Sequence, residues 1–515
     1  MKKKLIFSLL FFITIYSINL FSEETVNLAL WAHPPDIGKD LNSVKEFVSK
    51  CKKANVNLII LLVKDTSGKI YWHSKKFKEA IAPGWEEFDI VEEVIKESHK
   101  NGIKVHGWFC NFTESVDSYI YLKHPEWAMV NPSGTHSDSE KLGEGRSYGI
   151  VWMCPNRKPG YAYQWLLPMM EEILTLYEID GIHHDYVRYP GDVAPDTYCF
   201  CDYCLDDFFR YNHFVYDVYP DLILKPDPVL PRIEANWHLE YTAKPSNWKD
   251  LNRKEKAKYI LKGSFLPEAN PDLNYFFYEY RSDVITRFVR ESTLALKKIK
   301  PDVEISAAVF KNPMQSGRFI GQRWIDFAPW VDIMMPMCYR SHFQGSFENH
   351  IEMLGEYAEY EKKWAENLTK MYIGIATTYL YKEEYEPLNS IIYSSESIMK
   401  GLDVDKNCEM LRNEYSEKLE IRLKKFPDYH EKISDIIDKL LISKDLAVRK
   451  FYAENLTSIL IKLRNDPPPG YFPGEKLERI LFMLKDKKVE GIVIFAAGSL
   501  NREKLWQTLE KSVSK

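Results

Sequence analysis

The sequence lacks the excess of basic residues that nucleic-acid-binding proteins carry. Its 69 lysines and arginines are outnumbered by 74 aspartates and glutamates, which gives a formal net charge of −5 at pH 7. We also find no internal repeat and no low-complexity tract, and a hydrophobic fraction of 45% is ordinary for a globular protein. We therefore expect a folded protein without a nucleic-acid partner.

Long apolar runs are absent beyond the N-terminus. Three lysines at positions 2–4 precede an apolar run that ends at Ser22, and two glutamates follow. This order is typical of a secretory signal peptide. We expect residues 1–22 to be removed on export to the periplasm or the exterior, with an uncleaved anchor as the alternative. The mature chain would then have a formal charge of −8, because three lysines leave with the leader, and no membrane span.

A glycine-rich phosphate loop is also missing after the first apolar strand-like run, which ends in Trp31-Ala32-His33-Pro34-Pro35. Its absence argues against an open, doubly wound sheet. Eight such runs alternate with amphipathic segments of helical period, as in repeated βα units. We therefore predict an α/β fold, a (β/α)8 TIM barrel. Its strands are expected at residues 26–33, 57–65, 103–111, 181–189, 303–310, 331–339, 371–380 and 489–499.

Three connections are longer than a barrel requires, and they span residues 113–159, 191–274 and 381–470. All three leave from the C-terminal end of a strand, where TIM-barrel enzymes carry their catalytic residues. The third connection is charged and amphipathic, which indicates two or more helices. We predict long insertions in the βα loops, of which the third is helical.

Residues 179–190, with the sequence IDGIHHDYVRYP, place an acidic residue where the fourth strand ends. Side chains alternate along a strand, so His183 and Asp185 share one face and His184 lies on the other. The stretch resembles the DGIHxDYxRYP signature of glycosyl-hydrolase-like TIM-barrel families, which include the hydrolase domain paired with poly-N-acetylglucosamine deacetylases. The resemblance implies that Asp185 is a catalytic carboxylate. A cap of a helix, or a structural partner of Arg188, is the alternative.

Other segments extend the resemblance through most of residues 26–500, apart from the second and third insertions. Residues 63–68 resemble the family's VKDxSG, and residues 335–339 resemble its MPxxY. Residues 124–127 and 152–155 are similar to segments that follow the family's third strand, and residues 491–500 are similar to its eighth strand. The resemblance implies one glycosidase-like barrel over residues 23–515.

Glycoside hydrolysis needs two carboxyl groups, and Asp185 supplies the first. Asp65, which closes the second strand, is the predicted second carboxylate, and Glu114 is the next choice. The fifth strand has no acid at its C-terminal end. Its Glu304 lies at the opposite end, where we expect a structural role.

A glycan site needs aromatic platforms together with polar groups that fix the orientation of the sugar. Tyr339, in the segment similar to MPxxY, is the strongest candidate. His183 could donate a hydrogen bond to a sugar or to Asp185, or could be a satisfied core histidine; Arg188 could orient Asp185 or anchor the next loop. The remaining substrate-binding candidates at strand ends are Trp31, His33, Lys64, Trp108 and Asn111, with core positions as the alternative for the tryptophans.

No His-x-His pair stands on an early strand, so we expect no metal in catalysis. Cys199, Cys201 and Cys204 lie close together after the signature. Such thiols hold a structural metal such as zinc, here with Cys154 or His213 as fourth ligand, or they form disulfides in an oxidising compartment. We predict the metal site and keep disulfides as the alternative.

Together these features predict an exported glycoside hydrolase that acts on a polysaccharide or oligosaccharide and requires no cofactor for catalysis. A non-catalytic carbohydrate-binding protein on a degenerate barrel is the alternative function.

Overall fold

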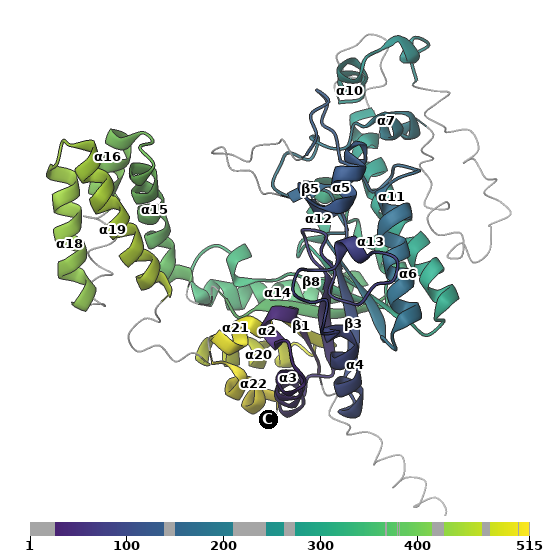
Figure 1. The fold of residues 1–515 in the computed structure, drawn as a ribbon, viewed down its shortest axis with the longest axis horizontal. Helices are drawn as coiled ribbons and strands as arrows, with labels where there is room; N and C mark the ends of the chain where they lie inside the picture. The colour runs from purple at the N-terminus through teal and green to yellow at the C-terminus, as the bar shows by residue number, and fades with distance from the viewer. Residues whose placement is uncertain are drawn as a thin grey trace, which may run out of the picture. The chain divides into compact units, whose positions relative to one another are not determined.

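The computed structural model describes residues 26–137, 150–209, 244–261, 273–365, 368–378, 380, 382–414, 427–465, 474–502 and 504–513 (Figure 1). The predicted signal peptide lies outside these residues. The chain divides into two compact units, the first formed by residues 1–337, 357–375 and 484–498 and the second by the remaining three segments. None of the helices within the described ranges combines the length and apolarity needed to cross a bilayer.

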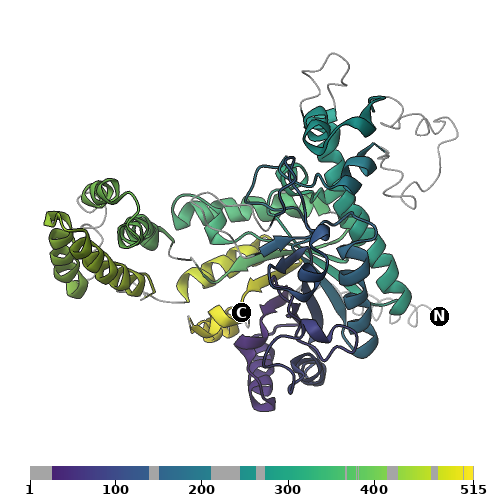
Figure 2. The same cartoon turned by 45° about the horizontal axis from the view of Figure 1, so that its top comes forward.

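Eight strands of the first unit close into a barrel in the order β1-β10-β9-β8-β7-β6-β3-β2 (Figure 2). The pairs are parallel, including β1 with β10, which closes the ring. The predicted (β/α)8 barrel is therefore confirmed. Its strands are β1 (Asn27–Ala32), β2 (Leu58–Lys64), β3 (Lys104–Cys110), β6 (Gly181–Asp185), β7 (Glu304–Val309), β8 (Ile333–Pro336), β9 (Lys370–Ala376) and β10 (Gly491–Phe495).

Apolar runs form these strands because both of their faces are covered. The residues of β2, LIILLVK, are buried throughout, as expected of a parallel strand with side chains inside the barrel and helices outside. Amphipathic helices with polar caps connect the strands. Asp40 accepts hydrogen bonds from two N–H groups at the start of α3 (Leu41–Lys53), and Asp89 caps α4 (Ile90–Lys100) by accepting one from the Glu92 N–H.

The later helices connect the remaining strands or, in the case of the last two, follow the last strand, β10. A π-helical turn, η4 (Ala162–Leu166), runs directly into α6 (Leu167–Leu176) before β6. The others are α11 (Leu273–Ile299), α12 (Pro313–Ile320), α13 (Trp324–Phe327), α14 (Phe347–Ala365), α20 (Glu475–Asp486), α21 (Ala497–Arg502) and α22 (Trp506–Val513).

The strand that carries Asp185 is shorter than predicted. We expected it to reach residue 189, but β6 ends at Asp185. The next residue, Tyr186, has φ +51°, a left-handed conformation that a strand does not accommodate. Asp185 is therefore the last residue of the strand.

Each of the first two insertions adds structure of its own to the first unit. The first contains α5 (Tyr119–Lys123) and an antiparallel pair of β4 (Thr113–Ser115) with β5 (Ile150–Trp152). The second contributes α7 (Asp202–Phe208) and α10 (Arg253–Leu261), drawn in the upper part of Figure 1. Both helices pack with α11 around a small apolar core that includes Phe208, Trp248, Ile260 and Phe277.

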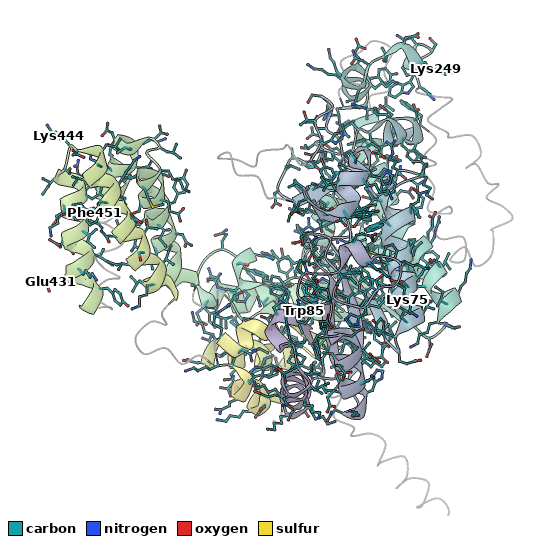
Figure 3. The ribbon with its side chains drawn as sticks, viewed as in Figure 1. Lys75, Trp85, Lys249, Glu431, Lys444 and Phe451 are labelled. Carbon is teal, nitrogen blue, oxygen red and sulfur yellow. The ribbon has the colours of Figure 1, made fainter. Side chains whose placement is uncertain are left out.

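The third insertion folds as helices in the second unit. Its described helices are α15 (Lys382–Met399), α16 (Val404–Glu414), α18 (Pro427–Ile442) and α19 (Leu446–Asn465). Figure 3 labels Glu431 on α18 and Phe451 on α19. The helices share an apolar core to which Leu411, Ile437 and Leu456 contribute.

Candidate active site

Asp185 ends β6 and is 8% exposed. Two hydrogen bonds fix its carboxyl group: the Trp108 indole Nε1 donates to Oδ2 across 3.1 Å, and the Tyr186 backbone N–H donates to Oδ1 across 2.7 Å. Because parallel strands point the same way, this carboxyl lies at the C-terminal end of the barrel. That is the end where barrel enzymes bind their substrates.

The surroundings of Asp185 favour its protonated form. Burial raises the pKa of Asp185 above its ordinary value. The positive charge of Arg188, the Tyr186 N–H and the Trp108 indole act in the opposite direction and offset only part of the effect of burial. A carboxyl group with a raised pKa keeps its proton at higher pH than an ordinary aspartate, which is what a general acid requires.

Arg188 lies in an enclosure of aromatic rings. Its guanidinium carbon is 5.1, 4.8 and 4.8 Å from the ring centroids of Trp152, Tyr186 and Phe310. Its Nη1 donates to the Tyr189 carbonyl across 3.2 Å, and its Nε has no hydrogen-bond partner among the described residues. Burial lowers the pKa of Arg188. The positive charge of Arg188 lowers the pKa of Asp185, against the larger effect of burial.

His183 belongs to a hydrogen-bonded chain inside the barrel. The Trp31 indole can only donate, and it donates to His183 Nε2 across 3.2 Å. The His183 Nδ1 proton therefore goes to Ser306 Oγ, 2.9 Å away. The chain continues through His106 to Glu304, with separations of 2.9 and 3.2 Å.

Both ring nitrogens of His183 are thus occupied, and burial lowers its pKa well below the ordinary value. Trp31 is 1% exposed and His183 is fully buried. The geometry matches the satisfied core histidine that we kept as an alternative. Room for the chain comes from Gly181, where a Cβ would lie 2.5 Å from the His106 ring.

His33 follows β1, and one third of its side chain is exposed (33%). Its Nδ1 lies 3.2 Å from Asp36 Oδ2, and its ring centroid is 5.0 Å from that of Trp108. The charge of His33 acts on Asp185. The contact between Nδ1 and the Asp36 carboxylate fixes the orientation of the ring and so of its other nitrogen, Nε2, as in many functional histidines.

Asp65 follows β2 directly, and its carboxylate is held by its own turn. Oδ1 accepts hydrogen bonds from the Ser67 N–H at 2.9 Å, the Ser67 hydroxyl at 2.7 Å and the Lys69 N–H at 2.9 Å. Oδ2 accepts one from the Tyr71 hydroxyl across 3.3 Å. A carboxylate offers about four lone-pair sites, so Oδ2 retains capacity for a further donor.

Lys64 and Glu114, by contrast, are buried against each other. Their charged groups lie 3.3 Å apart, with side-chain exposures of 0% and 1%. Lys64 also donates to the carbonyls of Cys110 and Thr113 at 2.8 and 2.9 Å, and the Tyr161 hydroxyl donates to Glu114 across 2.6 Å. This arrangement fastens the first insertion to β2 and leaves neither charge open to a substrate.

Asn111 faces the helices. Its amide lies 2.9 Å from Nδ1 of His184, and the His184 ring packs 6.1 Å from Phe288 of α11. Both residues are fully buried, and burial lowers the pKa of His184 to about 3. The alternation along β6 is therefore as expected, with His183 inside the barrel and His184 outside.

Tyr339 follows β8 and belongs to the second unit. It is half-buried, and its ring centroid lies 5.2 Å from that of His342. Its role in sugar binding stays a prediction.

Cys110 ends β3 and pairs with Asp185 of β6, and its carbonyl accepts a hydrogen bond from Lys64 across 2.8 Å. Burial raises the pKa of its thiol.

Sequence reasoning missed several neighbours of the site. The Tyr186 ring packs 4.8 Å from the Arg188 guanidinium carbon, and the charge of Asp192 acts on Arg188. Both residues stand within or beside the signature, so their position was a usable signal. Trp152 and Phe310 come from segments that are distant in the sequence. Trp152 stands in a segment that resembles the family and Phe310 ends a predicted strand, but neither position indicates a contact with Arg188.

The predicted cysteines gather as well. Cys199, Cys201 and Cys204 come together with Cys154, and the four sulfur atoms lie within 4.8 Å of one another. His213, the other predicted fourth ligand, lies outside the described residues.

Solved structures with a similar chain path include glycosidases, at low identity. The glycoside hydrolase domain of PgaB (BpsB) from Bordetella bronchiseptica is 13% identical, with 70% of this chain and 90% of that one covered and a TM-score of 0.47. α-L-fucosidase isoenzyme 2 from Paenibacillus thiaminolyticus is 15% identical, with 73% of this chain and 44% of that one covered and a TM-score of 0.39. The β-galactosidase from Rahnella sp. R3 is 14% identical, with 68% of this chain and 45% of that one covered and a TM-score of 0.43. This chain thus spans less than half of the fucosidase and of the galactosidase.

Among curated proteins, none matches the chain in sequence. Two family models do match. Residues 43–186 match the family described as "Hypothetical glycosyl hydrolase 6", and residues 229–376 match the family described as "Putative glycosyl hydrolase domain". The first match ends just past Asp185. Two segments of the chain are therefore similar to glycosyl-hydrolase-like families, and the resemblance that the signature predicted is confirmed.

Proposed function

We propose that the protein is an exported glycoside hydrolase that cleaves glycosidic bonds in a polysaccharide or oligosaccharide, with Asp185 as the general acid. The observation that carries this proposal is a buried carboxyl group with a raised pKa at the C-terminal end of a barrel strand. Protonated Asp185 would donate its proton to the oxygen of the leaving sugar as the glycosidic bond breaks. The matches to glycosyl-hydrolase-like families support the reaction class.

The second carboxyl group in this proposal is Asp65. Its carboxyl group accepts four hydrogen bonds, which fix its position directly after β2. Glycoside hydrolysis pairs an acid with a second carboxyl group that acts as base or nucleophile. In this proposal Asp65 would attack the sugar carbon or activate the water that attacks it.

Two accessible side chains next to Asp185 suit a sugar ligand. Tyr186 is half-buried and follows the acid directly, and His33 exposes a third of its side chain (33%). Both offer an aromatic face and a polar group, the combination that sugar rings require. We propose that they contact the sugar next to the scissile bond, and that the more buried Trp108 acts by orienting Asp185.

A carbohydrate-binding protein without catalysis is the second candidate. One observation favours it: Asp65 accepts four hydrogen bonds within its own turn, as a purely structural aspartate would. An Asp185→Asn variant separates the two functions. An enzyme loses turnover, whereas a binding protein keeps its affinity for the same glycan.

The experiment is a screen of the purified mature chain against a panel of polysaccharides that includes poly-N-acetylglucosamine. Release of new reducing ends by the wild type, and its loss in Asp185→Asn, supports the hydrolase. Saturable binding of a glycan without new reducing ends supports the second candidate. A chain that releases no reducing ends and binds no glycan of the panel would contradict both candidates.

Export is a separate part of the proposal, and it rests on the basic and apolar leader of residues 1–22. Expression of the full chain in a bacterial host, followed by intact mass analysis of the periplasmic fraction, tests it. A product that begins close to Glu23 supports export with cleavage. A full-length product in the cytoplasm contradicts it.

A further inference from the structure

We propose that Cys154, Cys199, Cys201 and Cys204 bind one zinc ion through their four thiolates, as a structural site that joins the first two insertions. All four ligand atoms lie within 4.8 Å of one another, and all four residues are buried. The Cys154 sulfur lies 3.9 Å from that of Cys201 and 3.5 Å from that of Cys204.

These distances fit a metal better than a disulfide. Sulfur atoms at the corners of a tetrahedron with Zn–S bonds of about 2.3 Å are about 3.8 Å apart, close to both values. A disulfide would bring two sulfurs to about 2.05 Å, and all eight cysteines of the chain are free. Four thiolate ligands also leave no open position for water, so the site would be structural and not catalytic.

The four ligands come from two different insertions. Cys154 follows β5 in the first insertion, and the other three lie immediately before and within α7 in the second. Backbone hydrogen bonds align the two segments: the Phe200 N–H donates to the Val130 carbonyl across 2.7 Å, and the Cys154 N–H donates to the Trp127 carbonyl across 2.8 Å. The chain therefore brings the sulfur atoms together through its own backbone.

Zinc with four thiolates carries a net charge of −2, and a buried cation nearby offsets part of this charge. Arg281 of α11 is 2% exposed, and its charge interacts with Cys199. Its terminal nitrogens donate to the carbonyls of Arg318 and Phe319, so it supplies a buried cation that those contacts do not neutralise. The Asn156 amide approaches the Cys204 sulfur at 3.9 Å.

The zinc ion would also steady part of the proposed active site. Trp152 stands two residues before Cys154, and its ring centroid lies 5.1 Å from the Arg188 guanidinium carbon and 5.8 Å from the Tyr186 ring. A fixed Cys154 limits how far this tryptophan can move from Arg188. The site thus connects the loop that follows β6 to the loop that follows β3.

Metal analysis of the full chain, purified without a metal-affinity tag and under reducing conditions, tests the proposal. We expect one equivalent of zinc per chain by elemental analysis, and loss of that equivalent in the double variant Cys201→Ser/Cys204→Ser. The matched control is Cys51→Ser/Cys408→Ser, which changes two buried cysteines outside the cluster and should keep the zinc. Retention of zinc by the first double variant would contradict the site.

A second measurement remains informative if the double variant does not fold. Zinc is removed from the wild-type chain with a chelator, and cobalt(II) is titrated in. We expect the intense visible absorption of tetrahedral cobalt–thiolate coordination to saturate at one equivalent, and the metal-free chain to melt at least about 5 °C lower than the zinc form. Absence of thiolate bands, stoichiometric iron in place of zinc, or a disulfide among these cysteines by mass spectrometry would overturn the proposal.

Discussion

The indole Nε1 of Trp108 donates a hydrogen bond across 3.1 Å to the Oδ2 atom of Asp185. Trp108 lies on β3, and Asp185 is the last residue of the adjacent strand β6. The two neighbouring strands therefore carry the acid and the group that orients it. The bond lowers the pKa of Asp185 against the larger, opposite effect of burial. It therefore orients the proposed acid and lowers its proton affinity.

Replacing Trp108 by phenylalanine removes that bond and keeps an aromatic ring. The pKa of Asp185 should rise further, because the indole stabilises the ionised form. The limb of the kcat/KM–pH profile that requires protonated Asp185 should then move to higher pH. We also expect kcat/KM at the optimum to fall about 10-fold as the carboxyl loses its orientation.

The control for this prediction is Trp248→Phe. Trp248 is also buried, and its indole donates to the Asp206 carboxylate across 3.2 Å in the second insertion. Its profile should match that of the wild type. An unshifted profile in Trp108→Phe would show that the indole does not act on the catalytic acid.

Stability should depend on the protonation of Asp185. Its pKa is raised in the folded chain, so the folded state binds the proton more tightly than the unfolded state does. The resulting stability is complete below the unfolded pKa of about 3.9 and is lost as pH rises through the folded pKa. Asp185→Asn should therefore melt at a higher temperature than the wild type at neutral pH, with a difference that shrinks toward pH 4. Thermal melts across this pH range measure it, and a difference that does not change with pH would contradict the buried, titrating carboxyl group.

Lys64 should matter for stability and not for substrate affinity. Lys64→Met leaves Glu114 as a buried charge without its cation, which should lower the free energy of unfolding by about 3–5 kcal/mol. The double variant Lys64→Met/Glu114→Gln should recover much of that loss, because both charges are then gone. Urea unfolding of the two variants measures the difference. A large rise in KM with unchanged stability would instead place Lys64 in contact with the substrate.

Asp65→Asn tests the second carboxylate while preserving its turn. An asparagine oxygen can still accept from the N–H groups of Ser67 and Lys69, so Tm should change by only a few degrees. If Asp65 is the base or nucleophile, kcat should fall about 100-fold or more. The comparison is Asp192→Asn, because Asp192, like Asp185, acts on Arg188 through its charge and is therefore another candidate for the second carboxyl group. Loss of turnover in Asp192→Asn but not in Asp65→Asn would assign the role to Asp192.

The barrel could be predicted because its strands are buried on both faces. Continuous apolar runs such as that of β2 indicate parallel strands, and their alternation with amphipathic helices predicts the fold class. The end of β6 could not be placed in the same way. Residues 186–189 continue the apolar and aromatic pattern of the strand, and only the backbone reveals the left-handed Tyr186.

Candidate site residues were harder to predict than strands because sequence position does not reveal what a side chain bonds to. Asp185 and Cys199, Cys201 and Cys204 stand in compact local patterns. Lys64 and His183 also stand near strand ends, but their partners, Glu114 and Ser306, lie far away in the chain. Those tertiary contacts give both side chains buried, satisfied positions. The enclosure of Arg188 depends on Trp152 and Phe310 in the same way.

The most direct test compares two aspartates at opposite ends of the same strand. Asp185 closes β6, whereas Asp180 precedes it and accepts hydrogen bonds from His99 and the Val105 N–H, each across 2.8 Å. On a glycan that the wild type hydrolyses, kcat/KM should fall about 100-fold or more in Asp185→Asn and less than about 3-fold in Asp180→Asn, with both chains folded by circular dichroism. Retention of more than about a tenth of wild-type kcat/KM by Asp185→Asn would contradict Asp185 as the catalytic acid.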